Sequence, residues 1–356
     1  LLDGRVKKVH TLRLPSVQPG DSTTLTLKVP KVKAAKGTLP ELCLNLHVLL
    51  REAQTFAPAG HEVALHQYVL RERGPLPQLQ ADAKAPHMLQ TGALHETKIG
   101  NSRVQLTFDN RTACLTGLAF DGRQVLAEQG GFSFDNHRWI ENDRYGNTQH
   151  GLRNYGHLTY TQQHPVVQGQ QTFSAQAPYV VTTQREGSLA DQRIVYTLHP
   201  NGVVDMEVTL RPKTTELRRA GVALGLDTAF TWVDYYALGP WENYPDRKTG
   251  YAISRYRMPL SDYMVDYIRP QDNGNRCDIR WFDISSADHS VRITGCQPLC
   301  IRAWDYREED LTAAHPHELR RGDAVNINID LNIHGVGGAD TWGKRTLPEY
   351  TIDGNL

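Results

Sequence analysis

The sequence predicts an all-β protein, and three observations lead to this. Apolar and polar residues alternate over many short stretches, which is the period-two pattern of half-buried strands. Turn-forming pairs such as Asp121-Gly122 and Asn273-Gly274 separate these stretches. Amphipathic helical periods are scarce, which argues against an α/β barrel or a dinucleotide-binding fold.

The clearest alternating runs are the expected strands. In each of them the apolar side chains occupy every second position and would lie on one face of a strand. The runs cover residues 25–29, 42–50, 104–108, 204–210 and 325–333. In the last run the apolar residues occupy the odd positions from Val325 to Ile333, which places Asn326 on the opposite face of the strand.

The 356 residues are enough for two domains or one large β domain. The alternation is interrupted from Arg73-Gly74-Pro75 to Pro86, and we interpret residues 73–90 as a linker. Residues 1–72 then hold about five to seven short strands, a size that fits an immunoglobulin-like β-sandwich. A complete sandwich of this kind has roughly 100 residues, so a truncated one is an open alternative. Residues 91–356 show no comparable break and are expected to form one large β domain.

The charges exclude several partners. Lys+Arg and Asp+Glu number 39 each, so the chain lacks the cationic field expected of a protein that binds nucleic acid or an anionic membrane. No run approaches the roughly 18 apolar residues of a membrane span, so we expect a soluble protein. The chain begins with Leu1 and shows no signal-peptide pattern, which indicates processing or a cut from a longer chain.

Metal-ligating residues show no familiar spacing. The five cysteines are odd in number and scattered, which favours reduced thiols and a cytoplasmic location. Cys296 and Cys300 have C-x3-C spacing without a second pair, and a turn between strands at Gln297-Pro298 is the favoured interpretation. Surface positions are likewise favoured over metal ligation for three histidines, His315, His317 and His334. We expect this chain to bind no metal or cofactor.

The segment 238–247 is dense in aromatic, charged and proline residues, and we call it the motif loop. In one interpretation its rings and polar groups contact a sugar. In the favoured, structural interpretation the prolines fix the loop, Glu242 pairs with Arg247, and the aromatic rings cap the core. The residues concerned are Trp241, Glu242, Asn243, Tyr244, Asp246 and Arg247.

A second polar and aromatic cluster runs from Phe134 to Trp139 and continues through Glu141, Asn142, Asp143 and Arg144. Its carboxylates, Asp135, Glu141 and Asp143, are candidates for an acid/base pair, although a structural connection is favoured. The glycine-rich segment 334–342 predicts a conformationally demanding loop rather than a phosphate cradle, because no helix follows it. Nucleophile-elbow, zincin and P-loop patterns are missing from the sequence.

The motif loop, Leu-Gly-Pro-Trp-Glu-Asn-Tyr-Pro-Asp-Arg, resembles the G-P-x-E-N-Y-P-D-R motif of family 2 glycoside hydrolases of the large bacterial β-galactosidase type. The resemblance lies in the carboxy-terminal domain of that family. It continues in the family's order through residues 258–262, 267–270, 273–276, 328–330 and 334–342, and more weakly upstream through 59–61, 135–136 and 154–157.

The resemblance implies a galactose-mutarotase-like β-supersandwich for the large domain, after the end of an immunoglobulin-like domain. It also implies that the two catalytic glutamates of a retaining glycosidase lie on a (β/α)8 barrel that would precede residue 1. This chain would then hold no catalytic residue and be inactive alone, either as a carboxy-terminal piece or as a natural small subunit. The implied partners are the barrel domain or a large subunit, a galactoside or related glycan, and further copies in a homo-oligomer. Mg or Na is possible in the barrel.

In the best-known branch of this family a Trp two residues before the Asn-Ile-Asp motif stacks on the sugar, and Asn326 aligns with that position. The stacking platform is then supplied by Trp139 or Trp342, or is lost. Two other functions stay open. One is a stand-alone carbohydrate-binding or assembly module, and the other is a mutarotase-like epimerase, which needs a His and a Glu in one pocket, for example His334 and Glu318.

Overall fold

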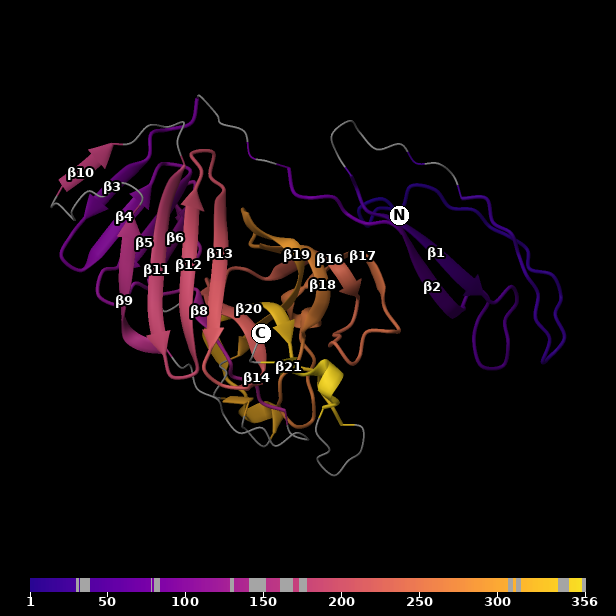
Figure 1. The fold of residues 1–356 in the computed structure, drawn as a ribbon. Helices are drawn as coiled ribbons and strands as arrows, with labels where there is room; N and C mark the ends of the chain where they lie inside the picture. Colours follow the sequence, from indigo (N-terminus) through magenta and orange to yellow (C-terminus); the bar gives the residue numbers. More distant parts are fainter. Residues whose placement is uncertain are drawn as a thin grey trace. The chain divides into compact units, whose positions relative to one another are not determined.

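The computed structural model describes residues 1–29, 32, 39–77, 79, 84–128, 131–140, 152–160, 169–172, 178–306, 310–311, 315–338 and 346–353. Its elements are nearly all antiparallel strands, so the all-β prediction is confirmed (Figure 1). Within these residues no helix is long and apolar enough to cross a membrane. The chain forms two compact units, one of Leu1–Gln78 with Ala252–Arg255 and one of Leu79–Tyr251 with Tyr256–Leu356.

The first unit contains one two-stranded antiparallel sheet of β1 (Leu42–Leu49) and β2 (Glu62–Arg71), in which Leu46 lies opposite His66. The amino-terminal ammonium of Leu1 donates to the carbonyl of Cys43 at 2.7 Å and ties the start of the chain to β1. The strand expected over residues 25–29 is wrong. Leu25 is 45% exposed, and no described segment of this unit forms a ladder with it. The immunoglobulin-like sandwich stays a prediction.

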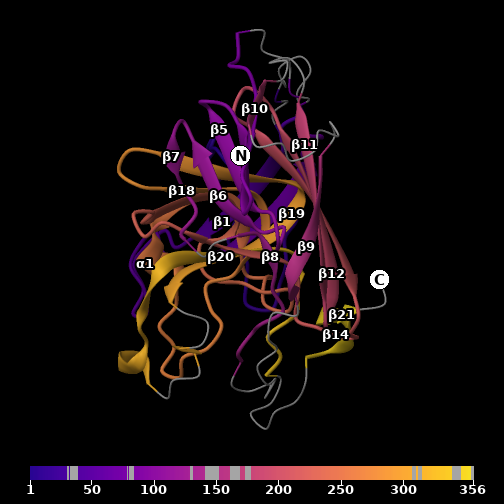
Figure 2. The same cartoon turned by 90° about the vertical axis from the view of Figure 1, so that its left-hand side faces the viewer.

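Three antiparallel sheets form most of the second unit (Figures 1 and 2). The six-stranded sheet has the order β10-β3-β4-β5-β6-β7, with β3 Leu89–Gly92, β4 Glu96–Gly100, β5 Val104–Asp109, β6 Leu115–Phe120, β7 Arg123–Gln124 and β10 Gly169–Thr172. The four-stranded sheet has the order β13-β12-β11-β9, with β9 Leu152–Tyr160, β11 Tyr179–Gly187, β12 Ala190–Leu198 and β13 Val204–Pro212.

The third sheet has seven strands and carries most of the polar clusters described below. Its order is β17-β16-β18-β19-β20-β15-β8, with β8 Ser133–Phe134, β15 Arg219–Leu226, β16 Trp232–Gly239, β17 Ala252–Pro259, β18 Arg276–Ser285, β19 Ser290–Tyr306 and β20 Arg321–Ile333. The remaining elements are short: β14 Glu216–Leu217 pairs with β21 Ile352–Asp353, α1 is Leu260–Tyr263, and 3-10 turns cover Pro316–Glu318 and Pro348–Tyr350.

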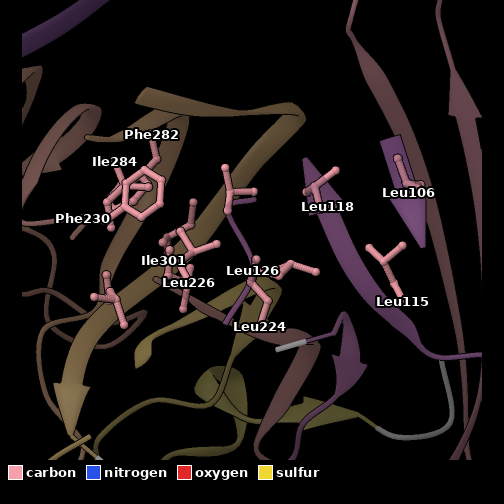
Figure 3. Packing of buried hydrophobic residues seen from close by; sticks show 14 of the residues in the cluster. Leu106, Leu115, Leu118, Leu126, Leu224, Leu226, Phe230, Phe282, Ile284 and Ile301 are labelled. Carbon is pink, nitrogen blue, oxygen red and sulfur yellow. The ribbon is translucent and has the colours of Figure 1, made fainter. Parts of the chain in front are cut away.

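One apolar core joins the three sheets. Leu106 and Leu118 of the six-stranded sheet and Leu224 of the seven-stranded sheet belong to the same buried cluster (Figure 3). The four-stranded sheet adds side chains such as Ile194 of β12, a strand in which buried and half-buried residues alternate as the period-two rule predicts. Burial of these side chains from water is the main force that holds the sheets together.

The linker expected over residues 73–90 ends earlier than the sequence indicated. Met88 is fully buried in the core, and β3 begins at the next residue. The side-chain amide of Asn101 also donates to the carbonyl of Pro86 at 3.1 Å. A methionine enclosed by other strands belongs to the folded unit rather than to a connection, and composition alone did not distinguish the two.

The alternation expected over residues 325–333 holds only in part. Val325, Ile327 and Ile333 are buried, but Leu331 is 56% exposed. The pairing between β15 and β20 shifts at this point, since Ala220 lies opposite Asn332 and Gly221 opposite Asp330. Leu331 is therefore the extra residue of a β-bulge, which turns its side chain toward solvent.

The turn expected at Gln297-Pro298 is also wrong, because β19 continues through these residues. The register with β18 shifts there instead, from Leu299 opposite Ile279 to Thr294 opposite Trp281. The intervening residues bulge out of the ladder and are exposed, except for Gly295. Turn-forming residues can thus be accommodated in a β-bulge, which does not end the strand.

Candidate functional site

Asn243 holds the motif loop in place. Its side chain is fully buried; its amide donates to the carbonyls of Leu238 at 3.2 Å and Trp241 at 3.0 Å, and its amide oxygen accepts from the N–H of Cys277 at 2.8 Å. The backbone of Asn243 also exchanges hydrogen bonds with Asn275, whose side-chain amide donates to the Asn243 carbonyl at 2.8 Å. One side chain thus satisfies the backbone of two neighbouring segments, which supports the structural interpretation of this residue.

The ion pair expected between Glu242 and Arg247 is wrong, because both side chains have other partners. Glu242 accepts a hydrogen bond from the Tyr267 hydroxyl and another from the N–H of Gly274 at 2.8 Å. Arg247 donates to the carbonyl of Gly337 at 3.2 Å. Segments distant in sequence offer these partners, so neighbouring opposite charges were a poor guide.

The neighbouring carboxylate, Asp246, anchors the glycine-rich segment that follows β20. Its two oxygens accept from the N–H groups of Val336 at 2.9 Å and Gly337 at 2.8 Å. Gly337 and Gly338 have φ of 73° and 71°, the left-handed region that glycine adopts most easily. The prediction of a conformationally demanding loop is confirmed for these residues.

The two aromatic residues of the motif loop have different surroundings. Tyr244 is 3% exposed, and the guanidinium of Arg138 lies 5.0 Å from the centre of its ring. Burial raises the pKa of Tyr244 well above its ordinary value, so its hydroxyl stays protonated and donates to Asp272 at 3.4 Å. Trp241 is 66% exposed, so the expectation that it caps the core is wrong.

Behind Tyr244, three buried arginines surround one buried carboxylate. Asp272 accepts from Nε of Arg138 at 2.8 Å and from Nη1 of Arg302 at 2.6 Å, and Nη1 of Arg219 lies 3.5 Å away. Burial alone raises the pKa of Asp272, but the three guanidinium charges outweigh it and hold that pKa well below its usual range. All four side chains are at most 1% exposed, so this charge cluster is removed from solvent.

The same network extends to β20 and to the segment before Trp139. Arg219 donates to Asp330 at 2.8 and 3.1 Å, and burial raises the pKa of Asp330 because Arg219 offsets it only in part. Arg302 also donates to the amide oxygen of Asn328, whose NH2 group donates to Asp135 at 2.7 Å. Asp135 is therefore a buried link of this network, and the geometry does not support its acid/base role.

Two of the predicted substrate-binding residues meet at one aromatic cluster. Asn326 of β20 lies opposite Trp304 of β19 and is half-buried, and its amide donates to the carbonyl of Tyr306 at 2.6 Å. Trp139 packs against the buried cluster that contains Trp304, Tyr306 and Met264. Its indole Nε1 is buried and has no hydrogen-bond partner among the described residues. We call these residues the Trp304 cluster.

Several other sequence candidates are not brought together. Glu318 accepts from the backbone N–H of His315 within its own 3-10 turn, whereas His334 lies beside the carbonyl of Gly335. His334 is buried rather than on the surface, and burial lowers its pKa. Among the described residues, no three His, Cys, Asp or Glu side chains lie together in a group that could hold a metal ion. Trp342, Glu141, Asn142, Asp143 and Arg144 lie outside the described residues.

The network of Arg138, Arg219, Asp272 and Arg302 was missed in the sequence. One signal was present: Asn328 and Asp330 occupy the even positions of a strand whose odd positions are apolar, and polar residues there predict a solvent-facing side. A paired strand that carries Arg302 makes that side a second buried face.

Comparisons with known proteins decide the family. The family model described as β-galactosidase small chain matches residues 100–355, and that of β-galactosidase domain 4 matches residues 1–71. The chain belongs to the β-galactosidase small-chain family. The β-galactosidases of Priestia megaterium and Vibrio cholerae are 28% and 27% identical to it, each over 99% of this chain and 34% of the relative. That of Pseudoalteromonas haloplanktis is 32% identical over 46% of this chain.

The small-chain family match confirms the resemblance that began at the motif loop. It covers that loop, the buried network and the Trp304 cluster. The chain spans about a third of the length of the curated β-galactosidases that it matches, so these relatives contain further domains.

Proposed function

We propose that this chain is the carboxy-terminal, non-barrel portion of a β-galactosidase and completes the rim of its active site. The catalytic glutamates would lie on a barrel in another part of the enzyme, and the partner of this chain is that barrel. The observation that carries the proposal is the match to β-galactosidases along 99% of this chain but only 34% of theirs. The buried, charge-balanced network described above suits a rigid support for such a rim.

Within this proposal the Trp304 cluster is the sugar-facing part of the chain. Asn326 is half-buried, and Trp139 contributes a partly buried aromatic ring whose indole N–H has no acceptor in the described part of the chain. An aromatic face and polar groups beside it are the components that bind a galactoside ring. A carbohydrate-binding module would use the same groups, whereas an epimerase needs a paired His and Glu.

The first test measures hydrolysis of a nitrophenyl β-galactoside by the purified chain alone and by the complete enzyme. The complete enzyme should turn over, whereas the chain alone should show no activity because the acid/base and nucleophile glutamates lie elsewhere. Turnover by the chain that disappears in an Asp135→Asn variant would contradict the proposal. Binding of galactose by the chain, without any activity of the complete enzyme, would favour the carbohydrate-binding module.

A second test replaces Asn326 by Trp in the complete enzyme. A ring at this position should add a stacking contact and tighten galactoside binding up to ~10-fold, from about 0.5–1.5 kcal/mol. Loss of the hydrogen bond to the Tyr306 carbonyl should cost about 1 kcal/mol of stability. The measurements are KM and inhibitor Kd, with thermal melts of both proteins. Asn326→Ala is the control, because it loses the same hydrogen bond and adds no ring. If Asn326→Trp binds the galactoside no more tightly than the wild type, this residue lies away from the sugar.

A further inference from the structure

A pocket of about 150 Å³ opens beside the motif loop, between Tyr244, Tyr267 and the glycine-rich segment that follows β20. A water molecule occupies about 30 Å³ in the liquid, so the pocket has room for about five waters or for one phosphate-sized group. Arg138 and Arg247 both line it, and among its described lining residues Asp272 is the one carboxylate.

Arg138 lines this pocket and carries one N–H group without an acceptor among the described residues. Its Nε donates to Asp272, and its Nη1 donates to the carbonyls of His334 and Gly335. Its Nη2 is buried and has no acceptor among the described residues, although the side chain is only 1% exposed. An unsatisfied buried donor costs free energy, and a donor that carries charge costs more. An acceptor with negative charge would remove that cost.

The neighbouring carboxylates do not fill this role, because each already has hydrogen-bond donors of its own. Asp272 is shared by three guanidinium groups. Glu242 accepts from Tyr267 and Gly274, and Asp246 accepts from two backbone N–H groups. The exposed Arg247 adds a second cation to the lining and donates to the Gly337 carbonyl at 3.2 Å.

We propose that this pocket binds a small oxyanion, a carboxylate or phosphate group, between Arg138 and Arg247. Guanidinium groups hold such groups well because their planar N–H donors match the spacing of two oxygens. The oxyanion is either a free ion or a carboxylate on a sugar, and the same chemistry serves both. This binding is independent of galactoside hydrolysis, so an inactive complete enzyme would not affect it.

The test titrates the 356-residue chain at constant ionic strength with phosphate, acetate, galacturonate and galactose, by calorimetry. Phosphate and acetate should bind at one saturable site, and galactose should not. If the chain binds galacturonate more tightly than acetate, the site is assigned to a sugar carboxylate. If the two affinities are equal, it is assigned to a free ion. Absence of saturation by all three anions, or binding of galactose as tight as that of galacturonate, would overturn the proposal.

Variants decide whether binding occurs in this pocket. Arg247→Gln should lower the affinity for the anions about tenfold, which corresponds to about 1.4 kcal/mol of binding free energy. The variant should fold normally, because the Arg247 side chain is exposed. Val336→Phe leaves both cations in place but fills the pocket, and should abolish binding. Arg211→Gln, on the exposed part of β13, is the matched control and should bind like the wild type. Equal affinity in Arg247→Gln and wild type would refute the assignment.

Discussion

Replacing Asp272 by Asn is expected to lower the free energy of unfolding of this chain by roughly 3–5 kcal/mol. The substitution keeps the size of the side chain but removes the charge that three buried guanidinium groups share. Arg219 would still pair with Asp330, but Arg138 and Arg302 would lose the carboxylate to which both now donate. Chemical denaturation of wild type and variant measures the difference directly.

The matched control for this experiment is Asp283→Asn. Asp283 makes two hydrogen bonds of 2.6 Å with Arg292, so its geometry is equally good, but the Arg292 side chain is 57% exposed. Solvent screens such a pair, and its loss should cost at most about 1 kcal/mol. Similar losses in the two variants would show that burial of the Asp272 cluster contributes little.

The stability difference between wild type and Asp272→Asn should also depend on pH. The pKa of Asp272 is lowered in the folded state, so its contribution is fully present above the pKa of an unfolded Asp, about 3.9, and is lost as the pH falls toward the folded value. The stability difference between wild type and Asp272→Asn should therefore stay constant from pH 7 to about pH 5 and shrink below about pH 4. A difference that grows in acid would contradict this assignment.

Replacing Asn243 by Ala should also lower the free energy of unfolding strongly, by about 3–5 kcal/mol. The variant leaves the Cys277 N–H and the carbonyls of Leu238 and Trp241 without the amide that now satisfies them, and each such group costs about 1–3 kcal/mol when buried. The measurement is urea denaturation of the chain, with the slope checked for an unchanged two-state transition.

Trp241→Ala tests the same loop without removing the hydrogen bonds of the Asn243 side chain. Because Trp241 is 66% exposed, its removal should change stability by no more than about 0.5 kcal/mol. A large loss in Trp241→Ala together with a small one in Asn243→Ala would reverse the roles assigned here. Such a result would mean that the ring, rather than the amide, holds the loop.

Some parts of the candidate site were predictable from local sequence. Asn243 and Asp246 were expected to be structural, and the positive φ angles of Gly337 and Gly338 agree with the expected demanding loop. The partners of Glu242 were not predictable. Tyr267 and Gly274 lie in a distant segment of the chain, and no local sequence pattern shows that this segment packs beside Glu242. The placement of Asn326 on the even face of its strand was correct, but its side chain is half-buried rather than fully exposed, and its amide donates to the Tyr306 carbonyl.

By itself the sequence determined the all-β class, the position of strands such as β5 and β13, and the family, because alternation and turn residues act locally and the motif loop is specific. Only the tertiary structure decided which polar residues are buried. Asp272 and Arg302 lie 30 positions apart and become partners when β19 pairs with β20 and the loop before β18 folds over them. A buried charge is stable only with its partner in place, and that partner is chosen by the packing of whole strands, not by neighbours in the chain.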